Sequence, residues 1–408
     1  MKIFYQSLFF ILITSFTVYS QSEDIYQIKY DIEYLASDDL EGRFPGTKGE
    51  DLAADFIADK FNEYGLSKIG DSYFQNFSFT LPSSPHEDVK FNQENNNKIE
   101  AKNVVGLIDN KKETTIIIGA HYDHIGYGGQ YSLDRGINEI HNGADDNASG
   151  TAMLLNLVKK LSKRNNSNSN YLFIGFSAEE LGLLGSRYFV NSNLYDEGTY
   201  NMMINLDMVG RLNEKKELSV FGAGTSSIFR QVLNSLNGSF NLNIINDGTG
   251  PSDHTSFYNK DLPVLFFHTG SHENYHRPSD DVELINYEGI HEISNYIVNV
   301  ISEIETYGKL DFKETVSNQP TVARFKVSLR VMPDYVFDGQ GMKADQVIKG
   351  GPADKAGLID GDIIIGIADF KVNDVYDYME ALSNFNEGDS TVIYVVREEQ
   401  RLEFQVRF

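Results

Sequence analysis

Between residues 103 and 304, short apolar runs alternate with segments whose apolar residues recur at helical spacing. The run at 114–120 is continuous enough to be buried on both faces, as strands inside a parallel sheet are. Alternation of this kind indicates an α/β fold with a largely parallel sheet and helices on both faces. We predict strands at 103–108, 114–120, 171–176, 202–206, 218–221 and 262–267, and helices at 49–64, 152–161, 184–190 and 287–304.

The composition narrows the possible partners. The chain has 408 residues and a formal net charge of −24, which argues against binding nucleic acid or an anionic membrane through bulk charge. It contains no cysteine, so a thiolate nucleophile and thiolate zinc sites are excluded. Clustered carboxylates remain compatible with a site for metal cations.

The N-terminus has the features of a cleaved export signal. Lys2 precedes an apolar run at 3–18, and small Ser20 lies before Gln21. A retained membrane anchor is the alternative, but the run is short for a span and acidic Glu23 follows it. We therefore expect an exported protein, periplasmic or secreted, with no stable membrane anchor after cleavage.

The remaining chain divides at a polar stretch. We predict a signal peptide at 1–20, a main domain at 21–308, a linker at 309–320 and a small α+β domain at 321–408. In the small domain, short predicted strands alternate with two short helices, at 353–356 and 375–383.

Imidazoles and carboxylates follow the predicted buried strands of the main domain. In open α/β sheets, functional groups gather past the carboxyl ends of the strands. Two histidines and several carboxylates without a thiolate suit zinc, manganese or cobalt. These side chains together therefore predict a metal site. The residues are His121 and Asp123, Asp145 and Asp146, Glu179 and Glu180, Asp207, and His276.

Two pairs among these residues suggest roles. Asp123 could accept a hydrogen bond from the second ring nitrogen of His121 and fix its tautomer. Glu179 and Glu180 are neighbours and cannot point the same way, so one can bind metal while the other acts as a base.

These residues lie in motifs that resemble the co-catalytic zinc aminopeptidases of the bacterial leucyl aminopeptidase and aminopeptidase Y type. The resemblance covers about residues 25–305 and implies a three-layer zinc exopeptidase domain of the phosphorylase/hydrolase-like class with a mostly parallel central sheet. The motifs are Gly119–His124, Gly143–Gly150, Ala178–Ser186, Asn205–Gly210, Ser252–Phe257 and Tyr275–Asp280, with a lead-in at Leu35–Arg43.

The resemblance also implies roles for the residues. Asp145 would bridge two Zn²⁺ ions, with Mn²⁺ or Co²⁺ as alternatives, and Asp146 would support the turn. His121 and Asp207 would complete one metal, and Glu180 and His276 the other. Glu179 would be the general base, and Asp123 would orient His121. Asp253 and His254 would belong to a possible substrate pocket. The resemblance also implies a cis peptide bond between Asp145 and Asp146.

The function implied is hydrolysis of the N-terminal peptide bond of peptides with a free N-terminus, by a water activated between two metals. A carboxypeptidase or dipeptidase on the same scaffold is one alternative. A glutaminyl cyclase, which uses a single zinc, is another, and a non-catalytic peptide-binding protein is a third.

The C-terminal region resembles a bacterial PDZ domain through its motif Gly350–Ile364. PDZ domains bind peptide C-termini by adding a strand beside a loop that holds the carboxylate. That loop would lie near 328–335, where Ser328–Pro333 lacks the glycine-rich form of eukaryotic members. The resemblance therefore leaves two roles open, peptide binding and docking.

Overall fold

The computed structural model describes residues 22–315 and 327–408, apart from 81–88, 94–96, 130, 135–136, 197, 334–336, 338, 387 and 399. The predicted export signal lies outside the described residues. The described chain forms two compact units that divide after Thr315, and each has its own apolar core. Among the described residues, no helix combines the length and the apolar character needed to cross a membrane.

The first part of the predicted linker packs on the first unit. The Lys309 ammonium donates to the Tyr200 carbonyl at 2.5 Å, and the Thr315 amide donates to the Tyr258 hydroxyl at 2.9 Å. The first unit therefore extends beyond the predicted boundary at 308, and residues 316–320 lie outside the described part.

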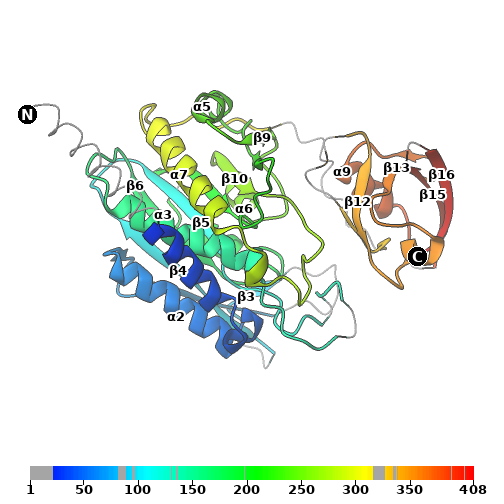
Figure 1. Ribbon diagram of the computed structural model, residues 1–408, viewed down its shortest axis with the longest axis horizontal. Helices are drawn as coiled ribbons and strands as arrows, with labels where there is room; N and C mark the ends of the chain where they lie inside the picture. Colours follow the sequence, from blue (N-terminus) through cyan, green and yellow to red (C-terminus); the bar gives the residue numbers. More distant parts are fainter. Residues whose placement is uncertain are drawn as a thin grey trace, which may run out of the picture. The chain divides into compact units, whose positions relative to one another are not determined.

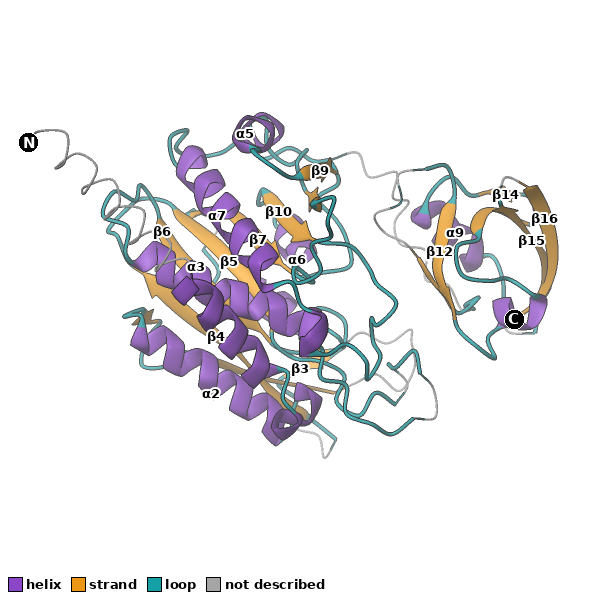
Figure 2. Ribbon diagram, in the orientation of Figure 1, coloured by secondary structure: helices purple, strands orange, loops and turns teal. Residues whose placement is uncertain are grey.

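The first unit is built on one mixed sheet whose centre is parallel (Figures 1 and 2). Its strands lie in the order β3-β2-β4-β6-β5-β7-β10-β8-β9, with β1 beside β4. The central strands β6, β5, β7 and β10 are parallel, whereas β4 and β8 run antiparallel to them. The bounds are β1 Ser67–Lys68, β2 Phe74–Thr80, β3 Lys90–Phe91, β4 Ile99–Ile108, β5 Thr115–His121, β6 Asn170–Phe176, β7 Tyr200–Leu206, β8 Glu217–Phe221, β9 Asn241–Ile244 and β10 Val264–His268.

Helices cover both faces of this sheet, which makes three layers. Residues of β5 alternate between the two cores: Ile116 and Ile118 pack with α2, α3, α5 and α7, whereas Ile117 packs with α4 and α6. Figure 1 shows α2, α3 and α7 lying across one face of the sheet. A first helix spans residues 22–35, and the others are α2 Lys48–Glu63, α3 Gly150–Ser162, α4 Leu184–Val190, α5 Phe229–Leu236, α6 His254–Tyr258 and α7 Tyr287–Ile304, with short turns at Asp38–Arg43 and Val282–Leu284.

The second unit is a small sheet with two helices, as the sequence predicts. The sheet has the order β11-β12-β13-β15-β16, with β14 beside β13, and β11 lies at its edge. The bounds are β11 Val331–Pro333, β12 Met342–Val347, α8 Pro352–Ala356, β13 Ile363–Ile367, β14 Phe370–Lys371, α9 Val375–Ser383, β15 Ser390–Arg397 and β16 Gln400–Arg407.

Candidate metal centre

The predicted metal-binding side chains meet at one edge of the main sheet. Strand β5 ends at His121, β6 leads into Glu179 and Glu180, and β7 leads into Asp207. Because these strands are parallel, their carboxyl ends lie at the same edge. The turn Ala144–Ser149, which precedes α3, enters this edge with all six residues buried.

One group of ligand atoms surrounds the His121 ring. Its Nε2 atom lies 3.3 Å from Asp146 Oδ1 and 3.4 Å from Asp207 Oδ1. Two ligands on a tetrahedral zinc, each about 2.0–2.1 Å from the metal, lie about 3.3 Å apart. The spacing of His121, Asp146 and Asp207 therefore fits one zinc ion.

A second group surrounds the His276 ring. Its Nε2 atom lies 3.2 Å from Asp146 Oδ2 and 3.0 Å from Glu180 Oε2, yet this buried nitrogen makes no hydrogen bond with any described residue. The other ring nitrogen, Nδ1, lies 3.1 Å from the Tyr131 carbonyl. That contact assigns the proton to Nδ1 and leaves Nε2 as a ligand atom. The two groups share Asp146, one carboxylate oxygen for each.

The structure corrects the expectation for the two adjacent aspartates. Asp146, which was expected only to support the turn, lies between the histidines. The Asp145 carboxylate instead accepts the Gly210 amide at 2.6 Å and lies 3.1 Å from His272 Nε2. The cis peptide bond is likewise one position later than expected, between Asp146 and Asn147. Both acids satisfy the same sequence pattern, so only the path of the turn distinguishes them.

Asp123 supports the centre in a different way from the one expected. The His121 Nδ1 atom lies 3.2 Å from the Asp123 backbone carbonyl and 3.8 Å from its carboxylate. The carboxylate instead accepts the backbone amides of Glu179 at 3.0 Å and Glu180 at 3.4 Å. Asp123 therefore holds the segment that carries both glutamates.

Further polar residues fix the orientation of the ligands. The Ser252 hydroxyl donates to Asp207 Oδ2 at 2.7 Å and leaves Oδ1 facing His121. The Asp280 carboxylate accepts the amides of Asp145 and Asp146 at 3.0 and 3.1 Å, which fixes the turn. Both Ser252 and Asp280 lie in motifs noted in the sequence, but nothing in the pattern gave them a role.

His124 is a neighbour of the site that the sequence analysis did not identify. Its Nδ1 atom lies 2.7 Å from Glu180 Oε1, a hydrogen-bond distance, shorter than the spacing of two ligands on one zinc. Oε2 of the same carboxylate faces His276. His124 therefore orients Glu180, and no ligand spacing in the sequence distinguishes such a histidine from a metal ligand.

The two neighbouring glutamates have opposite electrostatic environments. Burial and the Asp207 carboxylate raise the pKa of Glu179 well above its usual value, against the effect of His121. Burial also acts on Glu180, but His276 and the hydrogen bond from His124 outweigh it and lower the pKa of Glu180 to about 2. Glu180 therefore suits a permanently ionised ligand, and Glu179 suits a group that takes up a proton.

Asp253 and His254, the predicted pocket residues, are both buried. Burial raises the pKa of Asp253 to about 7, and this carboxylate also contributes to the raised pKa of Glu179. The His254 ring stacks on Phe266 with 4.7 Å between centroids, and burial lowers its pKa to about 3. His254 is thus a neutral packing residue, whereas Asp253 is a buried carboxyl near the metal centre that gains its charge close to neutral pH.

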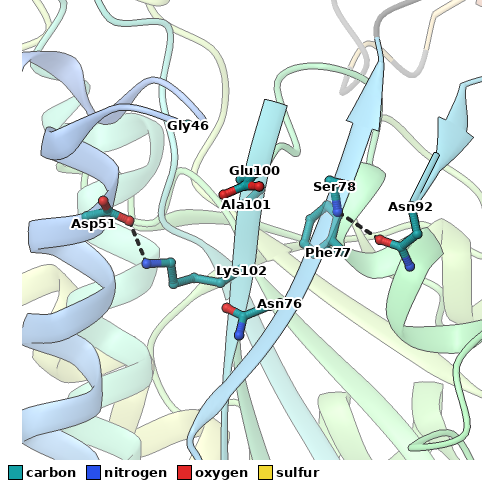
Figure 3. Close-up of a pocket in the computed structure, with 9 residues that line it drawn as sticks. All are labelled: Gly46, Asp51, Asn76, Phe77, Ser78, Asn92, Glu100, Ala101 and Lys102. Atoms are coloured by element: carbon teal, nitrogen blue, oxygen red, sulfur yellow. Dashed lines mark hydrogen bonds and ion pairs between the residues drawn. The ribbon is translucent and has the colours of Figure 1, made fainter. Parts of the chain in front are cut away.

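A separate cavity of about 600 Å³ lies between α2 and strands β2 and β4 (Figure 3). It contains the ion pair between Lys102 and Asp51, at 2.5 Å, and the Asn92 side chain accepts the Ser78 amide at 2.9 Å. None of the predicted metal ligands lines this cavity.

Comparison with protein families matches both units. The model of peptidase family M28 matches residues 103–301, and the PDZ domain model matches residues 325–408. All the proposed ligands and both neighbouring glutamates lie within the first match.

Curated relatives match about half of this chain. Aminopeptidase YwaD of Bacillus subtilis is 30% identical over 219 residues, which are 50% of this chain and 44% of that protein. A probable leucine aminopeptidase of Arthroderma otae is 25% identical over 222 residues, 51% of this chain and 58% of that protein. The chain thus spans about half the length of these relatives.

Solved structures share the fold. The zinc aminopeptidase BSAP from Bacillus subtilis aligns with a TM-score of 0.53 and 18% identity, over 70% of this chain and 95% of that chain. The glutaminyl cyclase of Porphyromonas gingivalis aligns with a TM-score of 0.55 and 16% identity, over 69% of this chain and 98% of that chain. The matches to the two family models, the ligand geometry and the three-layer fold agree with one another. The chain therefore belongs to peptidase family M28, with a PDZ domain after its peptidase domain.

Proposed function

We propose that this protein is an aminopeptidase that uses two zinc ions to hydrolyse the N-terminal peptide bond of its substrates. The observation that carries the proposal is the pair of ligand groups that share Asp146. One ion would be held by His121, Asp146 and Asp207, and the other by Asp146, Glu180 and His276. Zinc at such a pair of sites lowers the pKa of water and polarises a carbonyl.

Glu179 is the proposed general base. Its Oε2 atom lies 4.0 Å from His121 Nε2, at the border of the first ligand group, and its raised pKa favours taking up a proton. It would accept a proton from the attacking water and transfer it to the leaving amine. Asp123 holds the backbone of Glu179 and so keeps its carboxylate beside the reacting bond.

The engagement of the arginines near the site favours a substrate with a free α-ammonium group over one with a free α-carboxylate. The arginines near the site are already engaged: Arg277 pairs with Asp134, and Arg211 lies 3.5 Å from Asp280. Among the described residues, we find no unengaged arginine at the site that could receive a substrate carboxylate. This favours an aminopeptidase over a carboxypeptidase.

The substrate specificity can be tested with zinc-loaded full-length protein. We expect hydrolysis of a panel of aminoacyl chromogenic substrates and none of their N-acetylated forms. Cleavage of the blocked forms alone would overturn the aminopeptidase assignment. A peptide with N-terminal glutamine distinguishes an aminopeptidase from a glutaminyl cyclase. A glutaminyl cyclase would release ammonia and leave the cyclised residue on the peptide.

The role of Glu179 can be tested separately. Glu179→Gln should bind two zinc ions and lose about two to four orders of magnitude in kcat, the range for loss of a general base. Near-native turnover by a variant with a full complement of zinc would exclude this role.

We also propose that the PDZ domain binds peptide C-termini. Strand β11 is at the edge of its sheet and pairs only with β12 among the described residues, so its other side is available for an added strand. A fluorescent peptide with a free C-terminus should bind, and its C-terminally amidated form should not. Equal binding of both peptides, or of neither, would favour the docking role.

We also propose that the protein is exported and that its signal peptide is cleaved before Gln21. This proposal rests on the sequence features alone. N-terminal sequencing of the mature protein should find Gln21 as the first residue, and a protein that begins at residue 1 would contradict this proposal.

A further inference from the structure

Two buried ionisable side chains from outside the matched peptidase region contact the chain segments that carry the metal ligands. Arg43 lies in the turn Asp38–Arg43 and Glu50 in α2, both before residue 103, where the family match begins. Each is fully buried, with 0% exposure. Burying a charge costs free energy unless hydrogen bonds compensate it, so each needs a structural explanation.

Arg43 joins two of the chain segments that carry the metal ligands, those of His121 and Asp146. Its Nε atom donates to the Tyr122 carbonyl at 2.8 Å. Its terminal nitrogens donate to the carbonyls of Asn142 at 2.7 Å and Gly143 at 3.1 Å, and also to that of Leu35. Tyr122 follows His121, and Gly143 precedes the turn with Asp146. The planar guanidinium therefore fixes the distance between these two segments.

Glu50 holds the opposite end of the same tyrosine. Its Oε1 atom accepts the Ser177 hydroxyl and lies 3.3 Å from the Tyr122 hydroxyl, whose shorter hydrogen bond, at 2.6 Å, is to the Lys102 carbonyl. Its Oε2 atom accepts the Gly46 amide at 2.6 Å. Ser177 precedes Ala178, whose backbone is left-handed with φ 57°, a conformation that a non-glycine residue adopts only when its surroundings hold it.

We infer that Arg43 and Glu50 are positioning residues, which hold Tyr122 at both ends and thereby set the geometry of the metal centre. Tyr122 lies between His121 and Asp123, so its carbonyl and hydroxyl contacts fix the direction of both neighbours. Asp123 in turn holds the amides of Glu179 and Glu180. The N-terminal lead-in is thus part of the site, an inference that rests on the proposed two-metal centre.

The charge of Arg43 has a second effect on the centre. Arg43 forms no ion pair with any carboxylate in the described ranges, yet the Asp123, Asp146 and Glu180 carboxylates are near enough to raise its pKa. Burial outweighs them and lowers the pKa of Arg43 to about 10, so the side chain remains charged at neutral pH. It offsets part of the repulsion among these carboxylates.

The test compares two conservative variants with two surface controls. Arg43→Lys keeps the charge but loses the planar fork that reaches several carbonyls. Glu50→Gln keeps the shape, but an amide has only one acceptor oxygen for the donors that Glu50 now binds. Lys48→Met and Asp55→Asn are the controls, because both positions are exposed on α2.

Zinc affinity is the first readout, measured by competition with a chelating dye. Both test variants should bind zinc about 10–100-fold more weakly than the wild type, the usual cost of losing an outer partner of a metal ligand. Their kcat should fall while KM stays near the wild-type value, and the controls should match the wild type in both measurements.

The result that would overturn the inference is wild-type zinc affinity in both variants, even if their melting temperatures fall. If Arg43→Lys fails to fold, Glu50→Gln decides by the same criterion. The affinity readout is independent of the reaction: a wild type that binds two zinc ions but cleaves no free N-terminus would refute the proposed function and leave this comparison intact.

Discussion

At the scale of single residues, the centre depends on which of two adjacent aspartates faces the histidines. Asp146 offers one oxygen to each ligand group, whereas Asp145 contacts Gly210 and His272. A carboxylate that bridges two cations cannot be replaced by an amide without loss of charge and of one acceptor. The two positions therefore predict opposite outcomes for the same substitution.

Asp146→Asn should reduce the zinc content below two ions per chain, and Asp145→Asn should retain two. Metal analysis after gel filtration measures both, with Asp145→Asn as the matched control. Retention of two ions by Asp146→Asn together with loss by Asp145→Asn would restore the assignment expected from sequence.

Gly143 is required by the close approach of the turn to the site. Its φ is 56°, and a Cβ there would lie 2.1 Å from the Asp146 carbonyl oxygen and 2.5 Å from the His124 ring. Gly129 has a similar φ of 58° but no atom within 4 Å of the same position. Substitution of either glycine by alanine costs about 1–2 kcal/mol for the left-handed backbone. Only the substitution of Gly143 also creates a clash.

Gly143→Ala should therefore lose zinc affinity, and Gly129→Ala should lose only stability. Chelator competition and thermal melts measured on the two variants separate these effects. Equal zinc affinity in both variants would show that the turn tolerates displacement.

The residue types of the centre could be predicted from sequence, but the contacts of individual atoms could not. His121, Glu180, Asp207 and His276 were identified because each follows a strand or lies in a motif. The position of His124 against Glu180 depends on side-chain directions in a loop, which no periodicity encodes. The same holds for Arg43, whose partners lie up to 100 residues away in the chain.

At the scale of elements, the central strands and most of the helices that cover them were predicted, whereas several other elements were missed. Helices α4 and α7 have the predicted bounds, because their apolar residues repeat over complete turns. Strand β2 and helix α5 were not predicted. Strand β2, Phe74–Thr80, interrupts apolar residues with polar ones, and most of its residues are only partly buried. Strand β3 and the first residues of β4 lie in the polar, asparagine-rich stretch 82–100, where we predicted no strand.

The first helix packs on α2 through a buried acid. Asp31 is 1% exposed, accepts a hydrogen bond from Gln27 at 2.8 Å and lies 3.5 Å from the Lys60 ammonium. Burial raises its pKa to about 6, against the effect of Lys60. Because the pKa of Asp31 is higher in the folded state than in the unfolded state, protonation of Asp31 stabilises the fold. This stabilisation is complete below the pKa of Asp31 in the unfolded chain and is lost as pH rises through 6.

Comparison of the wild type with Asp31→Asn should show this loss. Between pH 4.5 and 7, the free energy of unfolding of the wild type should fall by about 2 kcal/mol relative to the variant. Urea denaturation of the metal-free proteins at both pH values measures the difference. Asp59→Asn, at an exposed position on α2, is the control. If the free energy of unfolding of the wild type relative to Asp31→Asn were the same at both pH values, the burial argument would be contradicted.

At the scale of the whole molecule, the chain joins a peptidase unit and a PDZ unit, each with its own core. The order of the two units was evident from the sequence because the strand and helix pattern changes near residue 309. The exact boundary was not, since Lys309–Thr315 is polar yet packs on the peptidase unit. Whether a polar segment packs depends on partners elsewhere in the fold, here Tyr200 and Tyr258.

The most direct test of the account is anomalous diffraction at the zinc absorption edge from crystals of the zinc-loaded protein. We predict two zinc peaks, one on each side of the Asp146 carboxylate. The first should be bound by His121 and Asp207, and the second by Glu180 and His276. A single peak, or a pair of peaks bridged by Asp145, would contradict the account.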